Sequence, residues 1–257
     1  MPFATVGDYR IRYRLTGEPS ALPPLVLIHG AGGGQYVWTE QRRLDVGRQL
    51  LTLDLPGHGQ STPEPAAVTI EEYAEVVTQL AEMLAVDRFV PVGHSMGGAV
   101  AQILALDHAD RVDALVLAAT GARLPTADFV FEAIRSSFGS FATLLAATAY
   151  APGTPAELVR RLTSGPLQAS QRIVLGDFTA CNRFDVRARL SEIAVPTLIL
   201  AAAEDRLMGA GRARQLETGI ADSRLIVVEG AGHMLMQEQP EAFGNAVKAF
   251  CEELRER

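Results

Sequence analysis

The segment FVPVGHSMGGAV, residues 89–100, places Ser95 in the spacing G-x-S-x-G between an apolar run and a predicted helix. A serine at the tip of such a sharp turn is held in a strained backbone conformation. The glycines beside it remove the Cβ atoms that would collide with the neighbouring strand and helix. The hydroxyl then projects above the sheet, near the positive end of the helix, where an anion is stabilised. This arrangement predicts a nucleophile at Ser95.

A serine hydroxyl is a poor nucleophile unless a base removes its proton, and histidine is the usual base. The chain has five histidines, of which four are expected to have structural or exposed roles: His29, His58, His94 and His108. The remaining one, His233, follows the last predicted strand in the loop VVEGAGHMLMQEQP. Because this glycine-flanked loop could carry an imidazole over the serine, His233 is the candidate base.

Two adjacent carboxylates follow another predicted strand and could orient the base. The segment LILAAAEDRLM puts Glu204 and Asp205 just past the strand end. Asp205 is preferred because it lies one residue further into the loop, and Glu204 is the alternative. The resulting chain order of serine, aspartate and histidine agrees with the order expected for a nucleophile in this kind of turn.

Short apolar runs alternate with helical patterns along most of the chain. After a predicted hairpin over residues 3–15, the apolar runs lie at 25–29, 49–54, 88–93, 114–119, 196–202 and 224–229. Helices are predicted between them, at 36–46, 69–85, 96–108, 209–219 and 240–255. Strands that are apolar on both faces and separated by helices predict an α/β fold with a mostly parallel central sheet and helices on both faces. Ligands of such sheets bind at the carboxyl ends of the strands.

The alternation breaks once, over residues 121–194, which show helical patterns and no strong strand. We expect this segment to be a helical cap inserted into a core domain formed by residues 1–120 and 195–257. Within it, Phe131, Phe138 and Phe141 recur at helical spacing and give one helix face an apolar character. That face either packs internally or roofs a pocket for an apolar part of the substrate.

Five motifs together resemble the α/β-hydrolase fold superfamily, and the resemblance covers nearly the whole chain. They are HGAGGG with Trp38 shortly after it, DLPGHGQS, GHSMGG, AEDRL, and GAGH before EQPEAF. The resemblance implies an oxyanion hole made by the backbone amides of Ala31 and Met96, and we count Trp38 among the candidate pocket residues. A dinucleotide fingerprint beginning at Gly30 fails, because its last glycine position is Gln35. The glycine-rich loop is therefore expected to serve an acyl oxyanion.

Composition and charge argue against several other classes of protein. The 30 acidic residues outnumber the 23 Lys and Arg residues, for a formal net charge of -7, and no basic stripe is present, so nucleic acid is not an expected partner. The N-terminal segment has no signal-peptide pattern and no apolar run is long enough to span a membrane, which predicts a cytoplasmic protein. The two cysteines, Cys181 and Cys251, suggest neither a disulfide framework nor a metal site. No cofactor or metal is expected, and the sequence does not indicate an oligomeric state.

The predicted reaction is hydrolysis of a carboxylic ester of a small to medium, largely apolar substrate, through an acyl-enzyme intermediate on Ser95. Other serine hydrolases of the superfamily remain as alternatives: an enol-lactone type lactonase, a carbon-carbon bond hydrolase and a cofactor-free perhydrolase. The carbon-carbon hydrolases usually have a Gly-Pro-Gly loop and a tryptophan after the histidine, whereas this chain has GAGGGQ and Met234. A ligand-binding receptor on the same fold, with little turnover, is the alternative from another class.

Overall fold

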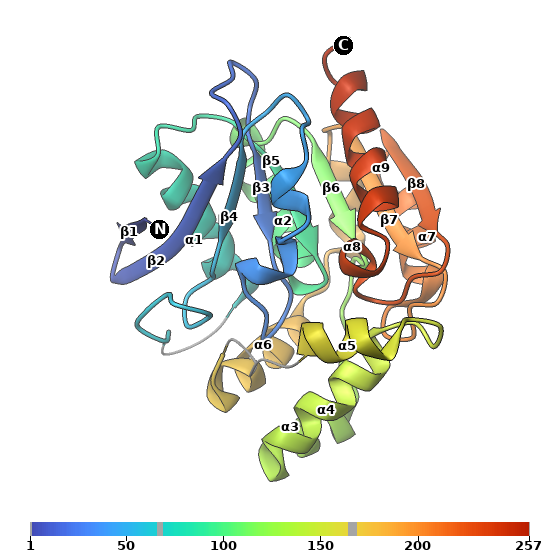
Figure 1. The fold of residues 1–257 in the computed structure, drawn as a ribbon. Helices are drawn as coiled ribbons and strands as arrows, with labels where there is room; N and C mark the ends of the chain where they lie inside the picture. The colour runs from blue at the N-terminus through green and yellow to red at the C-terminus, as the bar shows by residue number, and fades with distance from the viewer. Residues whose placement is uncertain (1, 66–68, 164–168, 257) are drawn as a thin grey trace.

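The computed structural model describes residues 2–65, 69–163 and 169–256, and within these ranges it contains an eight-stranded sheet (Figure 1). The strands lie in the order β1-β2-β4-β3-β5-β6-β7-β8. Their bounds are β1 Phe3–Val6, β2 Tyr9–Thr16, β3 Leu25–Ile28, β4 Leu50–Leu53, β5 Val90–His94, β6 Leu115–Ala118, β7 Thr197–Ala202 and β8 Ser223–Val228. β2 pairs antiparallel with β1 and with β4, and all other neighbours are parallel. The predicted mostly parallel sheet is confirmed.

The central strands build two apolar cores, one on each face of the sheet. In β3, Val26 and Ile28 belong to one core, while Leu25 and Leu27 belong to the other, and all four side chains are nearly fully buried. Because successive side chains on a strand point to opposite faces, a strand that is apolar at every position needs cover on both sides. The same alternation continues through β6 and β7.

Helices provide this cover on both faces. One core includes side chains from α1 (Ile70–Met83), α2 (Met96–Asp107) and α7 (Gly209–Gly219). The other includes side chains from α8 (Leu235–Glu238) and α9 (Pro240–Glu253), and α9 lies in front of the sheet in Figure 1. In the described part of the chain, no helix is both long and apolar enough to cross a membrane.

The helix predicted over residues 36–46 is wrong, because this segment forms two short 3₁₀ helices. They are η1 (Gln35–Trp38) and η2 (Gln41–Arg43). The amides of Thr39 and Leu44 bond to carbonyls three residues earlier, and the Thr39 hydroxyl donates to the Tyr36 carbonyl at 2.6 Å. Such local hydrogen bonds offer the backbone an alternative to an α-helix. Two further 3₁₀ helices are η3 (Ala109–Arg111) and η4 (Arg187–Glu192).

The chain between β6 and β7 contains helices that lie beyond the carboxyl ends of the strands. In the described residues they are α3 (Asp128–Ser136), α4 (Phe138–Ala149), α5 (Ala156–Thr163) and α6 (Gln171–Arg183). Figure 1 shows them gathered at the end of the sheet toward which the arrows of β3 and β6 point. A separate small core of Ile134, Phe141 and Val174 holds α3, α4 and α6 together. Residues 164–168 of the predicted cap lie outside the described residues.

Candidate active site

Ser95 lies in the one-residue turn between β5 and α2. Its backbone angles are φ 54° and ψ -118°, which a residue with a Cβ atom rarely adopts and which cost about 1–3 kcal/mol. Three hydrogen bonds hold this conformation. The Ser95 amide donates to the Ala118 carbonyl at 3.0 Å, and the Ser95 carbonyl accepts from the Gly98 amide at 2.9 Å and from the Thr120 hydroxyl at 2.8 Å. Ser95 itself lines a large cavity at the carboxyl ends of the strands.

The glycines around Ser95 are required by close backbone contacts. A Cβ atom on Gly93 would overlap the Gly97 carbonyl, and a Cβ atom on Gly97 would overlap the carbonyl of Ile28 in the neighbouring strand. A Cβ atom on Gly30, in the loop after β3, would lie 3.1 Å from the Cβ atom of Ser95. The absence of side chains therefore lets α2 start against β3 and lets the glycine-rich loop pass beside Ser95.

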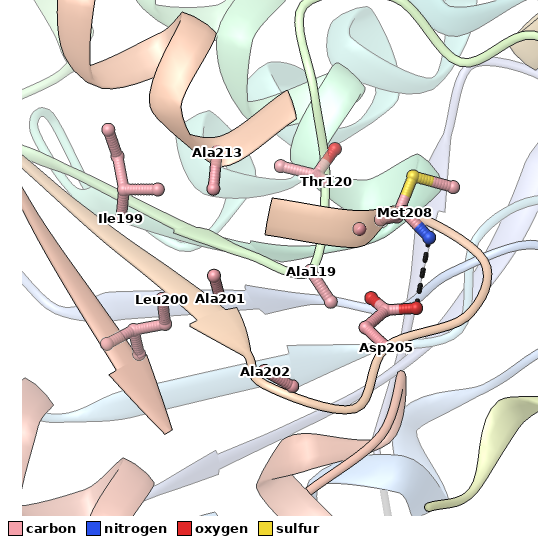
Figure 2. A pocket seen from close by; sticks show the side chains of 10 residues that line it. Ala119, Thr120, Ile199, Leu200, Ala201, Ala202, Asp205, Met208 and Ala213 are labelled. Atoms are coloured by element: carbon pink, nitrogen blue, oxygen red, sulfur yellow. Dashed lines mark hydrogen bonds between the residues drawn. The ribbon is translucent and has the colours of Figure 1, made fainter. Parts of the chain in front are cut away.

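His233 and Asp205 are brought together from the loops after β8 and β7. Nδ1 of His233 lies 2.9 Å from Oδ2 of Asp205, and both side chains are buried. The second carboxylate oxygen, Oδ1, accepts from the amides of Leu207 and Met208 at 2.8 and 3.0 Å, and Figure 2 shows the bond to Met208. Glu204 is exposed instead. The structure thus gives His233 the preferred carboxylate of the adjacent pair as its partner.

These contacts keep Asp205 in its charged form. Burial raises the pKa of Asp205, but the hydrogen bond to His233, the charge of His233 and the two backbone amides together lower the pKa below its usual value. A charged carboxylate at Nδ1 requires the Nδ1 hydrogen on a neutral His233, which leaves Nε2 as the acceptor for a proton.

A second, very small cavity of about 10 Å³ is lined by Asp205, Met208, residues of β7 and residues that follow β6 (Figure 2).

His94, for which the sequence analysis expects a structural or exposed role, is buried and contacts the loop of His233. Its Nε2 atom lies 2.9 Å from the backbone carbonyl oxygen of His233, and the two imidazole centroids are 4.8 Å apart. Burial, and next the charge of His233, lower the pKa of His94 to about 3, so its ring is neutral at pH 7. Because a carbonyl oxygen can only accept, Nε2 carries the hydrogen. The sequence feature that could have indicated this contact is the position of His94, beside Ser95 and at the end of the buried strand β5.

Ser95 and His233 both line one cavity of about 550 Å³. Its walls come largely from apolar residues of the loop after β6, of α3 and α4, and of α6: Leu124, Val130, Phe141, Leu145 and Phe178. Tyr36, Phe129 and Leu144 line the cavity and are also exposed, and so mark its mouth. A volume of this size and an apolar lining with a few polar groups are typical of small-molecule sites.

Of the four aromatic residues predicted to line the pocket, the structure places only Phe141 on the cavity wall. Trp38 is fully buried between His94 and Phe243, with its ring centroid 6.4 and 6.0 Å from theirs. Trp38 therefore packs against His94 in the core and does not line the cavity.

Phe131 and Phe138 also do not line the cavity. The Arg135 guanidinium lies over the Phe131 ring at 5.9 Å on the same helix, and Phe138 stacks on Phe141 with ring centroids 6.4 Å apart. Phe141 belongs to the small apolar core between these helices and Phe138 packs against it, whereas Phe131 does neither. Because α3 and α4 are separate helices divided at Ser137, the three phenylalanines do not form one continuous stripe.

The two residues expected to supply an oxyanion hole belong to the glycine-rich loop that passes beside Ser95 and to the start of α2. Ala31 lines the cavity, in a turn closed by a hydrogen bond of 3.1 Å from the Gly33 amide to the Gly30 carbonyl. Met96 is the first residue of α2, and its side chain is buried in the core beneath the site. The start of a helix and a glycine-rich turn are both sources of backbone amides for an anion.

Arg206 is the only Lys, Arg, Asp or Glu among the described residues that line the cavity. It follows Asp205 directly, and its guanidinium donates to the carbonyls of Ala147 and Tyr150 at 2.7 and 3.0 Å. Carbonyls at the end of a helix commonly accept such bonds. The loop that carries Asp205 is thus tied to the end of α4.

The parallel sheet and the Ser95, His233 and Asp205 arrangement are typical of one family of proteins, and comparison with known proteins identifies that family. Residues 23–240 match the family model described as alpha/beta hydrolase fold, and the chain belongs to this family. The curated relatives in this hydrolase family are named after different substrates.

Among the curated relatives, the chain is 30% identical over 267 residues to the protein named "Putative carbamate hydrolase RutD" from Azorhizobium caulinodans, with 99% of each chain covered. A solved hydrolase from Pseudomonas aeruginosa PA01 is 30% identical with a TM-score of 0.89, and 97% of each chain is covered. The solved enol-lactonase from Burkholderia xenovorans LB400 is 25% identical with a TM-score of 0.91, covering 97% of this chain and 99% of its own. Two of these three proteins are named as hydrolases and the third as an enol-lactonase.

Proposed function

We propose that this protein hydrolyses a carboxylic ester of a small to medium, largely apolar molecule, with Ser95 as nucleophile. The observation that carries the proposal is the 2.9 Å contact between Asp205 and His233, with His233 lining the same cavity as Ser95. A serine in a strained turn, a histidine and a buried carboxylate are the parts of a hydrolytic triad. The helices over residues 121–194 act in this proposal as the cap that selects the substrate.

In the proposed mechanism, Nε2 of His233 takes the hydroxyl proton of Ser95 as the serine oxygen attacks the ester carbonyl carbon. The carbonyl oxygen becomes an oxyanion, which the amides of Ala31 and Met96 stabilise. His233 then gives its proton to the leaving alcohol as the carbon–oxygen bond breaks, leaving an acyl group on Ser95. Water, deprotonated by His233, attacks the acyl carbon in the same way, and the acid is released with Ser95 regenerated.

A lactone is the second candidate substrate. A lactone is an internal ester, so the same steps apply, and the structural similarity to an enol-lactonase favours this alternative. A carbamate, as named for one relative, also presents a carbonyl carbon to the serine. A receptor on the same fold would bind in the cavity with little turnover, so a steady-state turnover measurement separates it from an enzyme.

The test of the proposal has two parts. A fluorophosphonate probe should add one adduct, on Ser95, and Ser95→Ala should remove it, as read by mass spectrometry of the digested protein. A panel of p-nitrophenyl esters of increasing acyl length, together with lactones, should then identify the favoured class by kcat/KM. Labelling that survives in Ser95→Ala would show that the nucleophile is another residue, and binding without turnover would favour a receptor.

A further inference from the structure

The carboxylate of Asp177, on α6, is fully buried. It accepts three hydrogen bonds from residues that precede the helices between β6 and β7 in the chain. Oδ2 accepts from the amide of Gly32 at 2.8 Å and from Nε2 of His58 at 2.9 Å, while Oδ1 accepts from the hydroxyl of Tyr73 at 2.9 Å. The three donors come from the loop after β3, the loop after β4, and α1. A buried carboxylate is costly unless it is fully bonded, so Asp177 is committed to these contacts.

The bond to Gly32 reaches the turn that carries Ala31. Gly32 has φ 64°, and the turn is closed by the bond from the Gly33 amide to the Gly30 carbonyl. The direction of the Ala31 amide depends on the neighbouring peptide units, because only two dihedral angles per residue can adjust. A carboxylate that binds the Gly32 amide fixes the Ala31–Gly32 peptide unit, and so limits the rotation of the neighbouring unit that carries the Ala31 amide.

His58 supplies the countercharge of Asp177. Its Nδ1 lies 3.1 Å from the Pro56 carbonyl oxygen and its Nε2 faces the Asp177 carboxylate. Both of these partners only accept hydrogen bonds, so both ring nitrogens carry hydrogens and the imidazole is positively charged. Burial lowers the pKa of His58, but the charge and hydrogen bond of Asp177, the hydrogen bond to the Pro56 carbonyl and the charge of Asp54 together raise the pKa above its usual value. Hydrogen bonds to charged groups are roughly twice as strong as neutral ones, which strengthens the contact between Asp177 and the Gly32 amide.

We propose that Asp177 is a positioning residue that sets the oxyanion turn at Gly30–Gly33 and couples it to helix α6. The inference rests on the proposed function, because it assigns the Ala31 amide to the oxyanion. The same helix contributes Phe178 and Cys181 to the cavity wall. Phe178, the residue after Asp177, thus lines the cavity. A substrate that packs against Phe178 therefore stabilises α6, the helix whose Asp177 binds the turn.

The variant Asp177→Asn tests this role. It keeps the shape of the side chain but removes the charge that holds the Gly32 amide and His58. We expect kcat to fall at least tenfold on the best ester, while KM changes by less than threefold, because an oxyanion contact acts mainly in the transition state. The affinity for a boronic acid, which forms a tetrahedral adduct with the serine, should fall by a factor similar to the loss in kcat/KM. A purely structural role would not produce these two matched losses.

Two further variants keep the test decisive. Tyr73→Phe removes the bond to Oδ1, the oxygen that does not contact Gly32, and should change kcat by less than threefold. If Asp177→Asn does not fold, the double variant Asp177→Asn, His58→Gln removes both buried charges together and should show the same loss of kcat. A folded Asp177→Asn variant, single or with His58→Gln, whose kcat stays within twofold of wild type would overturn the inference alone. A wild-type protein that neither turns over any ester nor accepts the fluorophosphonate on Ser95 would overturn the proposed function and the inference with it.

Discussion

The imidazole of His94 donates from Nε2 to the backbone carbonyl oxygen of His233 at 2.9 Å. The residue beside the candidate nucleophile thus holds the loop of the candidate base, although 139 positions separate them in the chain. His94 is neutral at this position because burial makes a charged imidazole unfavourable. Protonating His94 would place a charge inside the buried site, so the stability of this arrangement depends on pH.

Acid should destabilise the fold through His29 and His94. Burial is the largest cause that lowers the pKa of His29 to about 4 and that of His94 to about 3. As the pH falls below the unfolded pKa of about 6.5, the unfolded chain binds protons that the folded protein does not, so stability falls toward pH 4. Each histidine should contribute a slope of up to about 1.4 kcal/mol per pH unit.

Urea denaturation at pH 7, 6 and 5 measures this slope. His94→Asn, whose amide can still donate to the His233 carbonyl, should reduce the slope, whereas the control His108→Gln should leave it unchanged because His108 is not buried. A wild-type free energy of unfolding that stays constant from pH 6.5 to 4.5 would contradict the prediction.

Asp205→Asn should lower kcat far more than Glu204→Gln. The amide would keep the shape of Asp205 but lose the charge that orients His233, a change that costs on the order of 10⁴ in kcat in serine proteases. Glu204 is exposed, so removing its charge should change kcat by less than about tenfold. Both variants are measured on the same ester, with the fold checked by circular dichroism. Two small effects would show that the Asp205–His233 pair does not serve catalysis.

Phe141→Ala should change the preference for acyl chain length. Phe141 lines the cavity, and losing a buried aromatic contact of about 1.5–3 kcal/mol corresponds to a ten- to hundredfold loss in kcat/KM for a long acyl chain. The rate for an acetyl ester should change much less. Phe131→Ala is the matched control on the neighbouring helix, since Phe131 does not line the cavity. An equal loss for long and short esters would mean that Phe141 acts only as core packing.

Gly97→Ala should destabilise the protein by about 3 kcal/mol or more, because its Cβ atom would overlap the backbone carbonyl of Ile28 and backbone atoms cannot move aside as a side chain can. Gly211→Ala in α7 is the control. Apart from its chain neighbours and the nearby backbone of α7, no atom lies within 4 Å of the new methyl group there, and alanine should be neutral or stabilising by about 0.5–1 kcal/mol. Urea denaturation compares the two variants. Equal stabilities would refute the steric argument for the turn.

The sequence alone determined the fold class and the turn that holds the candidate nucleophile, Ser95. Alternating apolar runs and helical patterns reflect burial on both faces of a strand, which is a local property of residue order. The turn around Ser95 was equally local, because glycines are needed within two residues of the serine. The error over residues 36–46 arose because local hydrogen bonds closed 3₁₀ turns where the residue types also suited an α-helix.

Only the tertiary structure decided which side chains meet. Glu204 and Asp205 are neighbours of similar chemistry, and the path of the loop after β7 placed one of them against His233 and the other in solvent. His94 contacts the His233 loop, and Asp177 contacts Gly32 across 145 positions. Trp38, predicted at the pocket, instead packs behind it. Such contacts depend on how whole elements pack against each other, and no spacing along the chain specifies them.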